Sequence, residues 1–279
     1  MKIKFIDVDG ISTRCLIAGD QRSFPILFLH GYGSSADSWI RNIDALSDEF
    51  FVIAPDMIGC GFTKPVKMGR GATPAETLAH LRKLIDKLGL GKFCPIGTSY
   101  GSLIAALLYF EFPQRVGKLV IAGSGSCFNT DEQLVSTLNR MRQNFRIMME
   151  DLSVESSRNY QKKQCYDPTV VPEEMLLAMT TAYAQPGMKE VWEDGVERLL
   201  DLKATAPYRI LHRLEQMHVD TLVIWGRQDV GAIHESAVAA VRRLPKAKLI
   251  TLEKCGHRPM LEHPDLFNGE VRSFLRSRS

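Results

Sequence analysis

Gly97-Thr98-Ser99-Tyr100-Gly101 lies between an apolar run at residues 93–96 and a helix-forming stretch at residues 99–112. A serine between two glycines at a strand-to-helix turn has the form of a nucleophile elbow, in which the sharp turn exposes the hydroxyl. The glycines let strand and helix approach closely, and we expect the serine backbone to be strained. The motif alone is weak, but its place between a strand and a helix predicts that Ser99 is a nucleophile.

Short apolar runs alternate with amphipathic stretches on both sides of this turn. The predicted strands are residues 2–8, 13–18, 26–30, 51–54, 93–96, 116–122, 221–225 and 248–252. The predicted helices around them are residues 36–50, 74–88, 99–112, 208–217, 236–244 and 264–275. Strands separated by helices of this length imply right-handed crossovers and a mostly parallel sheet.

The alternation is interrupted between residues 127 and 202, where helical patterns occur without a convincing strand. One α/β core, residues 1–126 and 203–279, with a helical insertion at residues 127–202 explains this order better than two successive domains. Some apolar side chains of the insertion should line a pocket, while most should pack in its core. The candidates are Phe128, Leu134, Leu138, Met141, Phe145, Met148, Met149, Met175, Met179 and Trp192.

The composition is that of an ordinary globular protein, with 279 residues, 45% hydrophobic and 24% charged. The net charge of +3 is too small and too evenly spread to indicate nucleic acid or an anionic membrane as a partner. No apolar stretch is long enough for a transmembrane helix, and the N-terminus lacks the apolar segment of a signal peptide. Six scattered cysteines are typical of reduced, mostly buried thiols, without a disulfide framework or a zinc site. We therefore expect a cytoplasmic protein.

Two further residues follow strands in the way that partners of a catalytic serine should. His257 comes directly after the last predicted strand, and Asp229 follows the strand before it. Both therefore fall at the carboxyl edge of the sheet, as the elbow does, and open α/β sheets build their sites at that edge. The chain order Ser99, Asp229, His257 is that of an elbow hydrolase. Asp56 and Glu253 are weaker candidates for the carboxylate that orients the histidine.

An acyl-transfer site also needs N–H donors for the oxyanion. One should be the backbone N–H of Tyr100, directly after the nucleophile. The other should come from the loop His30-Gly-Tyr-Gly33, where Tyr32 N–H is the candidate and Gly31 lets the backbone approach a substrate. We expect His30 to brace these loops.

His30-Gly-Tyr-Gly33, the elbow, Gly226-Arg-Gln-Asp229 and Gly256-His257, in this order, resemble the α/β-hydrolase fold over about residues 20–275. The resemblance implies a mostly parallel eight-stranded sheet flanked by helices, with the insertion as a helical cap. It also implies a serine triad that needs no metal and no cofactor. Branches of this fold that place aspartate at the nucleophile position are excluded.

The stretch at residues 54–65 and Gln185-Pro-Gly187 resemble the meta-cleavage product hydrolases. Those enzymes cut a carbon–carbon bond in 2-hydroxy-6-oxo-dienoates made by aromatic ring fission. This chain has Thr98 where they usually have Asn, Arg258 where they have Trp, and Met179 where they have Arg. In that family these groups handle the carboxylate and keto-enol end of the substrate. The departures favour a related esterase, a group that includes hydrolases of phthalate monoesters.

The favoured function is therefore a serine-dependent hydrolase of a small carboxylic ester that acts through an acyl-enzyme. Aromatic monoesters and monoesters that bear a carboxylate are the candidate substrates. The alternative is a C–C bond hydrolase of 2-hydroxy-6-oxo-dienoates, and a ligand-binding receptor on the same fold ranks third. The predicted substrate-binding residues are Gly31, Thr98, Met179 and Arg258. Arg258 either clamps a substrate carboxylate, points to solvent or pairs with Glu262. A small molecule is the expected partner, and a homodimer stays an open alternative.

Overall fold

The computed structural model describes residues 1–65 and 67–277. Its strands form one eight-stranded sheet in the order β1-β2-β4-β3-β5-β6-β7-β8. The strands are β1 (Lys2–Val8), β2 (Ile11–Ala18), β3 (Pro25–Leu29), β4 (Phe51–Pro55), β5 (Cys94–Thr98), β6 (Lys118–Ala122), β7 (Asp220–Gly226) and β8 (Ala247–Leu252). β2 pairs antiparallel with β1 and β4, and every other neighbouring pair is parallel. The mostly parallel eight-stranded sheet expected from the sequence is confirmed.

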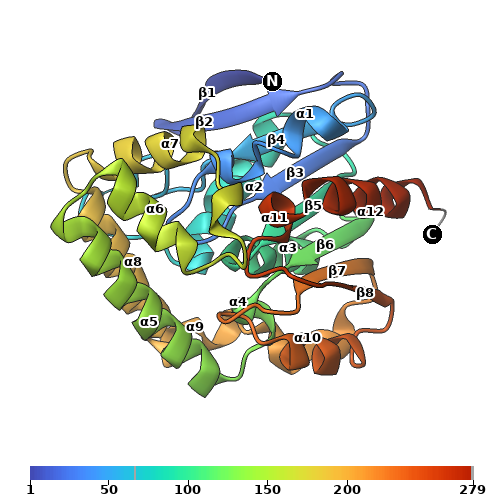
Figure 1. The fold of residues 1–279 in the computed structure, drawn as a ribbon. Helices are drawn as coiled ribbons and strands as arrows, with labels where there is room; N and C mark the ends of the chain where they lie inside the picture. The colour runs from blue at the N-terminus through green and yellow to red at the C-terminus, as the bar shows by residue number, and fades with distance from the viewer. Residues whose placement is uncertain (66, 278–279) are drawn as a thin grey trace.

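Helices cover both faces of this sheet (Figure 1). They are α1 (Ile43–Leu46), α2 (Pro74–Lys87), α3 (Tyr100–Glu111), α10 (His234–Val241), α11 (Pro259–Glu262) and α12 (Pro264–Arg276). Alternate residues of a strand point to opposite faces, so β3 divides its side chains between two apolar clusters. Leu27 and Leu29 pack with α2, α3 and α10, whereas Ile26 and Phe28 pack with α1, α11 and α12.

Residues 36–50 form two short turns, η1 (Ala36–Trp39) and α1, where the sequence pattern predicts one helix. The polar residues between the apolar ones have partners elsewhere in the fold. Asn42 Nδ2 donates to the carbonyl of Met260 at 3.2 Å and to Asn268 Oδ1 at 2.9 Å. These bonds tie the junction between η1 and α1 to the C-terminal helices, while Trp39 is fully buried as its spacing predicts.

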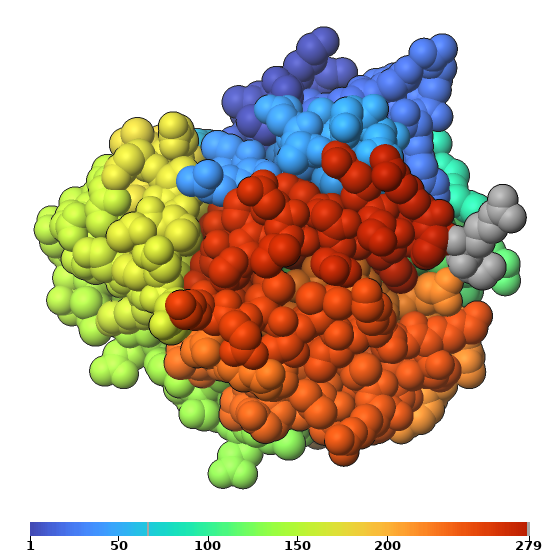
Figure 2. Space-filling view, turned by 45° about the vertical axis from the view of Figure 1, so that its right-hand side comes forward, coloured from blue at the N-terminus to red at the C-terminus, as the bar shows by residue number. Residues whose placement is uncertain are grey.

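The described chain between β6 and β7 contains helices and no strand. The elements are α4 (Gly125–Phe128), α5 (Asp131–Glu150), α6 (Val154–Lys162), η2 (Pro168–Val170), α7 (Glu173–Tyr183), α8 (Met188–Leu200), α9 (Leu202–Thr205), η3 (Ala206–Tyr208) and η4 (Ile210–Gln216). α5 to α8 lie together beside the sheet (Figure 1), and Figure 2 shows this yellow-green region against the red C-terminal segment. Since α4 and α9 straddle the expected ends of the insertion, its extent as a separate cap domain stays a prediction.

Two expectations from composition can be compared with the structure. All six cysteines are free, and five of them are buried. Within residues 1–65 and 67–277, no helix combines the length and the apolar character needed to cross a membrane.

The junction of β5 and α3 has the geometry of the predicted elbow. Ser99 has φ 53° and ψ −123°, a left-handed backbone conformation that side-chain-bearing residues rarely adopt. A Cβ at Gly97 would collide with the backbone of Gly101, and a Cβ at Gly101 would collide with the Leu29 carbonyl. Both glycines are therefore required for strand, turn and helix to pack this closely.

Replacing Gly101 by alanine should destabilise the fold by about 1–3 kcal/mol, because the new methyl group overpacks α3 against β3. The matched control is Gly269→Ala in α12, where an added Cβ meets nothing within 4 Å. This control should stabilise the protein by about 0.5–1 kcal/mol, since alanine favours a helix more than glycine does. Urea unfolding of both variants measures the difference, and equal effects would contradict the close approach at Gly101.

Candidate active site

The three residues predicted to form a triad meet at the carboxyl edge of the sheet. Ser99 follows β5, Asp229 follows β7 and His257 follows β8. The Asp229 side chain is fully buried, and its Oδ2 accepts a hydrogen bond from His257 Nδ1 at 2.7 Å. Its Oδ1 accepts from the N–H groups of Gly231 and Ala232, both at 2.8 Å. A carboxylate held in this way fixes the histidine tautomer with the proton on Nδ1 and leaves Nε2 free to accept a proton.

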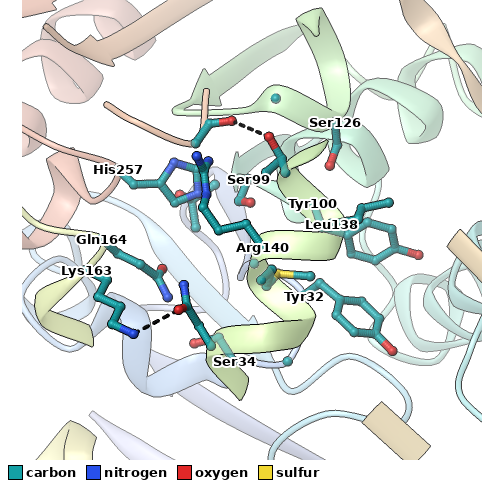
Figure 3. Close-up of a pocket in the computed structure, with 18 of the residues that line it drawn as sticks. Tyr32, Ser34, Ser99, Tyr100, Ser126, Leu138, Arg140, Lys163, Gln164 and His257 are labelled. Atoms are coloured by element: carbon teal, nitrogen blue, oxygen red, sulfur yellow. Dashed lines mark hydrogen bonds between the residues drawn. The ribbon is translucent and has the colours of Figure 1, made fainter. Parts of the chain in front are cut away.

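Ser99 and His257 line the same pocket (Figure 3). Within the described part of the chain, the Ser99 hydroxyl makes no hydrogen bond to the imidazole. Catalytic hydrogen bonds are often loose in the absence of substrate and tighten when it binds. Both side chains therefore border one cavity that a substrate can occupy.

The weaker carboxylate candidates are engaged elsewhere. Asp56 is fully buried and accepts hydrogen bonds from the backbone N–H of Ala36 at 2.7 Å and from Arg14 at 3.2 Å. Glu253 is paired with Arg227 at 3.1 Å. Of the three acidic candidates, Asp229 alone is bonded to the His257 ring.

The backbone of the loop after β3 passes directly against the predicted nucleophile. A Cβ added at Gly31 would lie 3.3 Å from Ser99 Cβ. Tyr32 follows Gly31, and Tyr100 follows Ser99 as the first residue of α3, where helix N–H groups have no partner within the helix. In the described chain neither Tyr32 N–H nor Tyr100 N–H donates to a protein acceptor. The two predicted oxyanion donors thus lie beside Ser99 and are unpaired.

His30 holds this loop in place. It is fully buried, and its Nε2 accepts from the Met57 N–H at 2.9 Å. Its Nδ1 must therefore carry the proton, which it donates to the Gly31 carbonyl at 2.7 Å. Burial lowers the pKa of His30 to about 4, so the ring is neutral at physiological pH. These contacts fit the bracing role expected from the sequence.

The residues predicted to bind substrate divide into two groups. Gly31, Thr98 and Arg258 line the pocket. The structure does not bring Met179 to it: this residue is buried on α7, where its sulfur accepts from Gln161 Nε2 at 3.0 Å. Gln161 lines the pocket in its place. The prediction that Met179 lines the pocket, which rests on an approximate correspondence with the related family, is therefore wrong. Met179 packs behind Gln161, which lines the pocket.

The insertion supplies pocket residues that the sequence analysis did not single out. Leu134, Leu138 and Met141 were expected candidates, but polar side chains accompany them. These are Thr137, Arg140, Asn144, Tyr160, Gln161, Lys163 and Gln164, and the core adds Ser126. The α5 members recur every three or four residues, so they share one helix face. That spacing could have identified this face from the sequence, although not the pocket it faces.

The described lining of the pocket contains three cationic side chains, Arg140, Lys163 and Arg258, and no aspartate or glutamate. Arg140 donates to the Val230 carbonyl at 2.7 Å, and Lys163 donates to Asn144 Oδ1 at 2.8 Å, marked in Figure 3. None of the three forms an ion pair with a described residue. The pocket is therefore positively charged and suited to an anionic ligand. Across residues 1–65 and 67–277, no group of three or more His, Cys, Asp or Glu side chains could hold a metal ion.

Comparison with known proteins identifies the family to which this fold belongs. The sequence profile described as "alpha/beta hydrolase fold" matches residues 25–264. The chain belongs to the α/β hydrolase fold family. A 2-hydroxy-6-oxononadienedioate/2-hydroxy-6-oxononatrienedioate hydrolase of Pseudomonas sp. is 30% identical, over 98% of this chain and 96% of the relative. A hydrolase of the same name from Burkholderia vietnamiensis is 29% identical, over 90% of this chain and 86% of the relative.

The fold of this α/β hydrolase is also similar to that of a solved hydrolase structure. The 2-hydroxy-6-oxo-6-phenylhexa-2,4-dienoate hydrolase of Rhodococcus sp. strain RHA1 superposes with a TM-score of 0.81 at 25% identity. The match covers 99% of this chain and 100% of that structure. The similarity thus extends over core and insertion together.

The buried histidines predict how stability depends on pH. Burial lowers the pKa of both His30 and His80 to about 4, whereas an unfolded chain protonates histidine near pH 6.5. Between these values the unfolded chain binds more protons, so the free energy of unfolding should fall as the pH falls. The slope is about 1.4 kcal/mol per pH unit for each histidine.

His80→Gln should remove about half of that slope while leaving His30 in place. Glutamine can keep the contact of His80 Nε2 with Thr13 Oγ1, which is 2.9 Å long. Urea unfolding of both proteins between pH 7 and pH 5 gives the two slopes. The same slope in both would contradict a neutral, buried His80.

Proposed function

We propose that this α/β hydrolase cleaves a carbon–carbon bond in a 2-hydroxy-6-oxo-dienoate, with Ser99, His257 and Asp229 as its triad. The observation that carries the proposal is the cationic, acid-free pocket beside Ser99 and His257, because such substrates are carboxylate anions. The relatives named above, which match nearly the full chain, support the same substrate class.

The residues would divide the chemistry as follows. The 2-hydroxyl proton moves to C5, which converts the dienol into a 2,6-dioxo acid. His257 then takes the Ser99 proton as the hydroxyl attacks the C6 carbonyl, and the N–H groups of Tyr32 and Tyr100 stabilise the oxyanion. Breaking the C5–C6 bond sends its electron pair into the conjugated 2-oxo acid, which leaves as a 2-hydroxydienoate after protonation. Water activated by His257 then releases the second carboxylic acid from Ser99.

Hydrolysis of a small carboxylic ester is the second candidate. It uses the same triad and oxyanion donors but needs no proton shift before attack. The presence of Thr98 and Arg258, where the C–C hydrolases usually have other residues, favours it. The sequence motifs favour the ester, whereas the similarity over the full chain favours the C–C hydrolase, the alternative reaction.

The two candidates differ in one measurable ratio. We expect kcat/KM for a 2-hydroxy-6-oxo-dienoate to exceed that for p-nitrophenyl acetate by at least about tenfold on one preparation of the enzyme. Loss of the dienoate absorbance and release of p-nitrophenol report the two reactions. The Ser99→Ala variant supplies the blank for each. Preference for the ester would reverse the ranking, and a single slow turnover of either compound would instead indicate a receptor.

Ser99→Ala should lower kcat for the preferred substrate by about 10⁴–10⁶-fold, because the nucleophile is removed while the oxyanion donors remain. Steady-state kinetics measures this loss, and circular dichroism checks that the variant is folded. Ser136→Ala is the matched control, because it removes the hydroxyl of an exposed serine on α5 that does not line the pocket. A loss below about tenfold in Ser99→Ala would mean that the nucleophile is misassigned.

A further inference from the structure

Arg258 is a buried cation without an anionic partner in the described chain. It is 7% exposed and lies directly after His257, and it lines the pocket. Its side chain makes one hydrogen bond, from Nη2 to Gln164 Oε1 at 2.9 Å, and its Nε has no partner. A guanidinium stays protonated in proteins, and a buried charge without a counter-ion is costly. The fold therefore bears a cost that a bound anion would offset.

Glu262, the acid considered as a partner in the sequence analysis, does not neutralise this charge. Its Oε1 accepts from the backbone N–H groups of Gly256 at 2.9 Å and Arg258 at 3.2 Å. Its Oε2 accepts from the Tyr166 N–H at 2.6 Å. Both oxygens thus cap backbone amides. The guanidinium neither pairs with Glu262 nor points to solvent.

Gln164 belongs to the insertion, and its side-chain oxygen orients the Arg258 guanidinium by accepting a hydrogen bond from it. Its carbonyl accepts the His257 N–H at 2.7 Å, so the same residue contacts the loop of the predicted base through its backbone and Arg258 through its side chain. An amide oxygen orients a guanidinium without neutralising it. The positive charge therefore remains available to the pocket.

We propose that Arg258, oriented by Gln164, is a carboxylate-binding subsite that selects acids over neutral analogues. A guanidinium presents two parallel N–H donors that match the two oxygens of a carboxylate. The proposal deepens the proposed function and rests on it for the identity of the substrate. Holding the carboxylate end of a planar conjugated chain determines where its 6-carbonyl falls relative to Ser99.

The test measures binding without turnover. In the Ser99→Ala protein, isothermal titration gives Kd for 2-oxopentanoate and for its neutral analogue of the same shape, 2-oxopentanamide. We expect the acid to bind more tightly. Arg258→Gln should weaken binding of the acid by at least about tenfold and change binding of the amide less than about twofold. Arg258→Lys keeps the charge but loses the two parallel N–H donors of the guanidinium. Its affinity for the acid should lie between those of the parent protein and Arg258→Gln.

Arg41→Gln is the matched control, because Arg41 is an exposed arginine outside the pocket lining. It should keep the preference for the acid, since an exposed charge is screened by solvent. The inference is overturned if Arg258→Gln keeps that preference, or if the parent protein binds acid and amide equally. Should Arg258→Gln not fold, Arg258→Lys decides: unchanged affinity for the acid overturns the inference.

Turnover by the enzyme with Ser99 separates this inference from the proposed function. If the acid preference depends on Arg258 but no dienoate is cleaved, the subsite stands and the C–C hydrolase proposal fails. If the dienoate is cleaved and its KM is unchanged in Arg258→Gln, the reaction stands and the subsite fails.

Discussion

The left-handed backbone of Ser99 is the constraint on which the rest of the site depends. Such a conformation costs on the order of 1–3 kcal/mol, so its surroundings must enforce it. Ser99 N–H donates to the Ala122 carbonyl at 3.0 Å, and Ser102 Oγ donates to the Gly97 carbonyl at 2.7 Å. The neighbouring strand and the first turn of α3 thus hold the turn from both sides. The hydroxyl then lies at the edge of the sheet, and beside it the first N–H of α3 has no acceptor among the described residues.

Two buried arginines show how differently this fold treats charge. Arg14 donates to Asp37 at 2.7 Å and to Asp56 at 3.2 Å, so its guanidinium is neutralised inside the core. Arg258 is equally buried but has the neutral amide of Gln164 as its side-chain partner. Burial without a counter-ion lowers the pKa of Arg258, whereas the carboxylates beside Arg14 raise the pKa of that guanidinium. The contrast is what a structural arginine and a ligand-binding arginine should show.

The sequence predicts features that local chemistry determines and misses those that depend on distant contacts. The elbow is readable because its glycines act on adjacent residues, and Asp229 and His257 are readable because strand ends share one edge of a parallel sheet. The apolar spacing of residues 36–50 predicts one helix, because nothing nearby in the sequence reveals that Asn42 bonds to Asn268. Met179 is predicted at the pocket only through its correspondence with an arginine of the related family. The insertion has no sheet edge to fix its register, and helix packing places Met179 behind Gln161.

The motifs of the core do not decide between ester hydrolysis and C–C bond hydrolysis, because both reactions use the same groups around Ser99. An ester already carries a leaving group that accepts electrons, so a nucleophile, a base and two N–H donors suffice to cleave it. Cleaving a carbon–carbon bond also requires an electron sink several atoms from the attacked carbonyl. That sink is the conjugated end of the substrate with its carboxylate, which must be held in one plane. We therefore expect the residues that distinguish the two reactions to lie where Arg258 of the core donates to Gln164 of the insertion at 2.9 Å. If Arg258 holds that carboxylate as proposed, the specificity of this protein depends on the contact between Arg258 and Gln164.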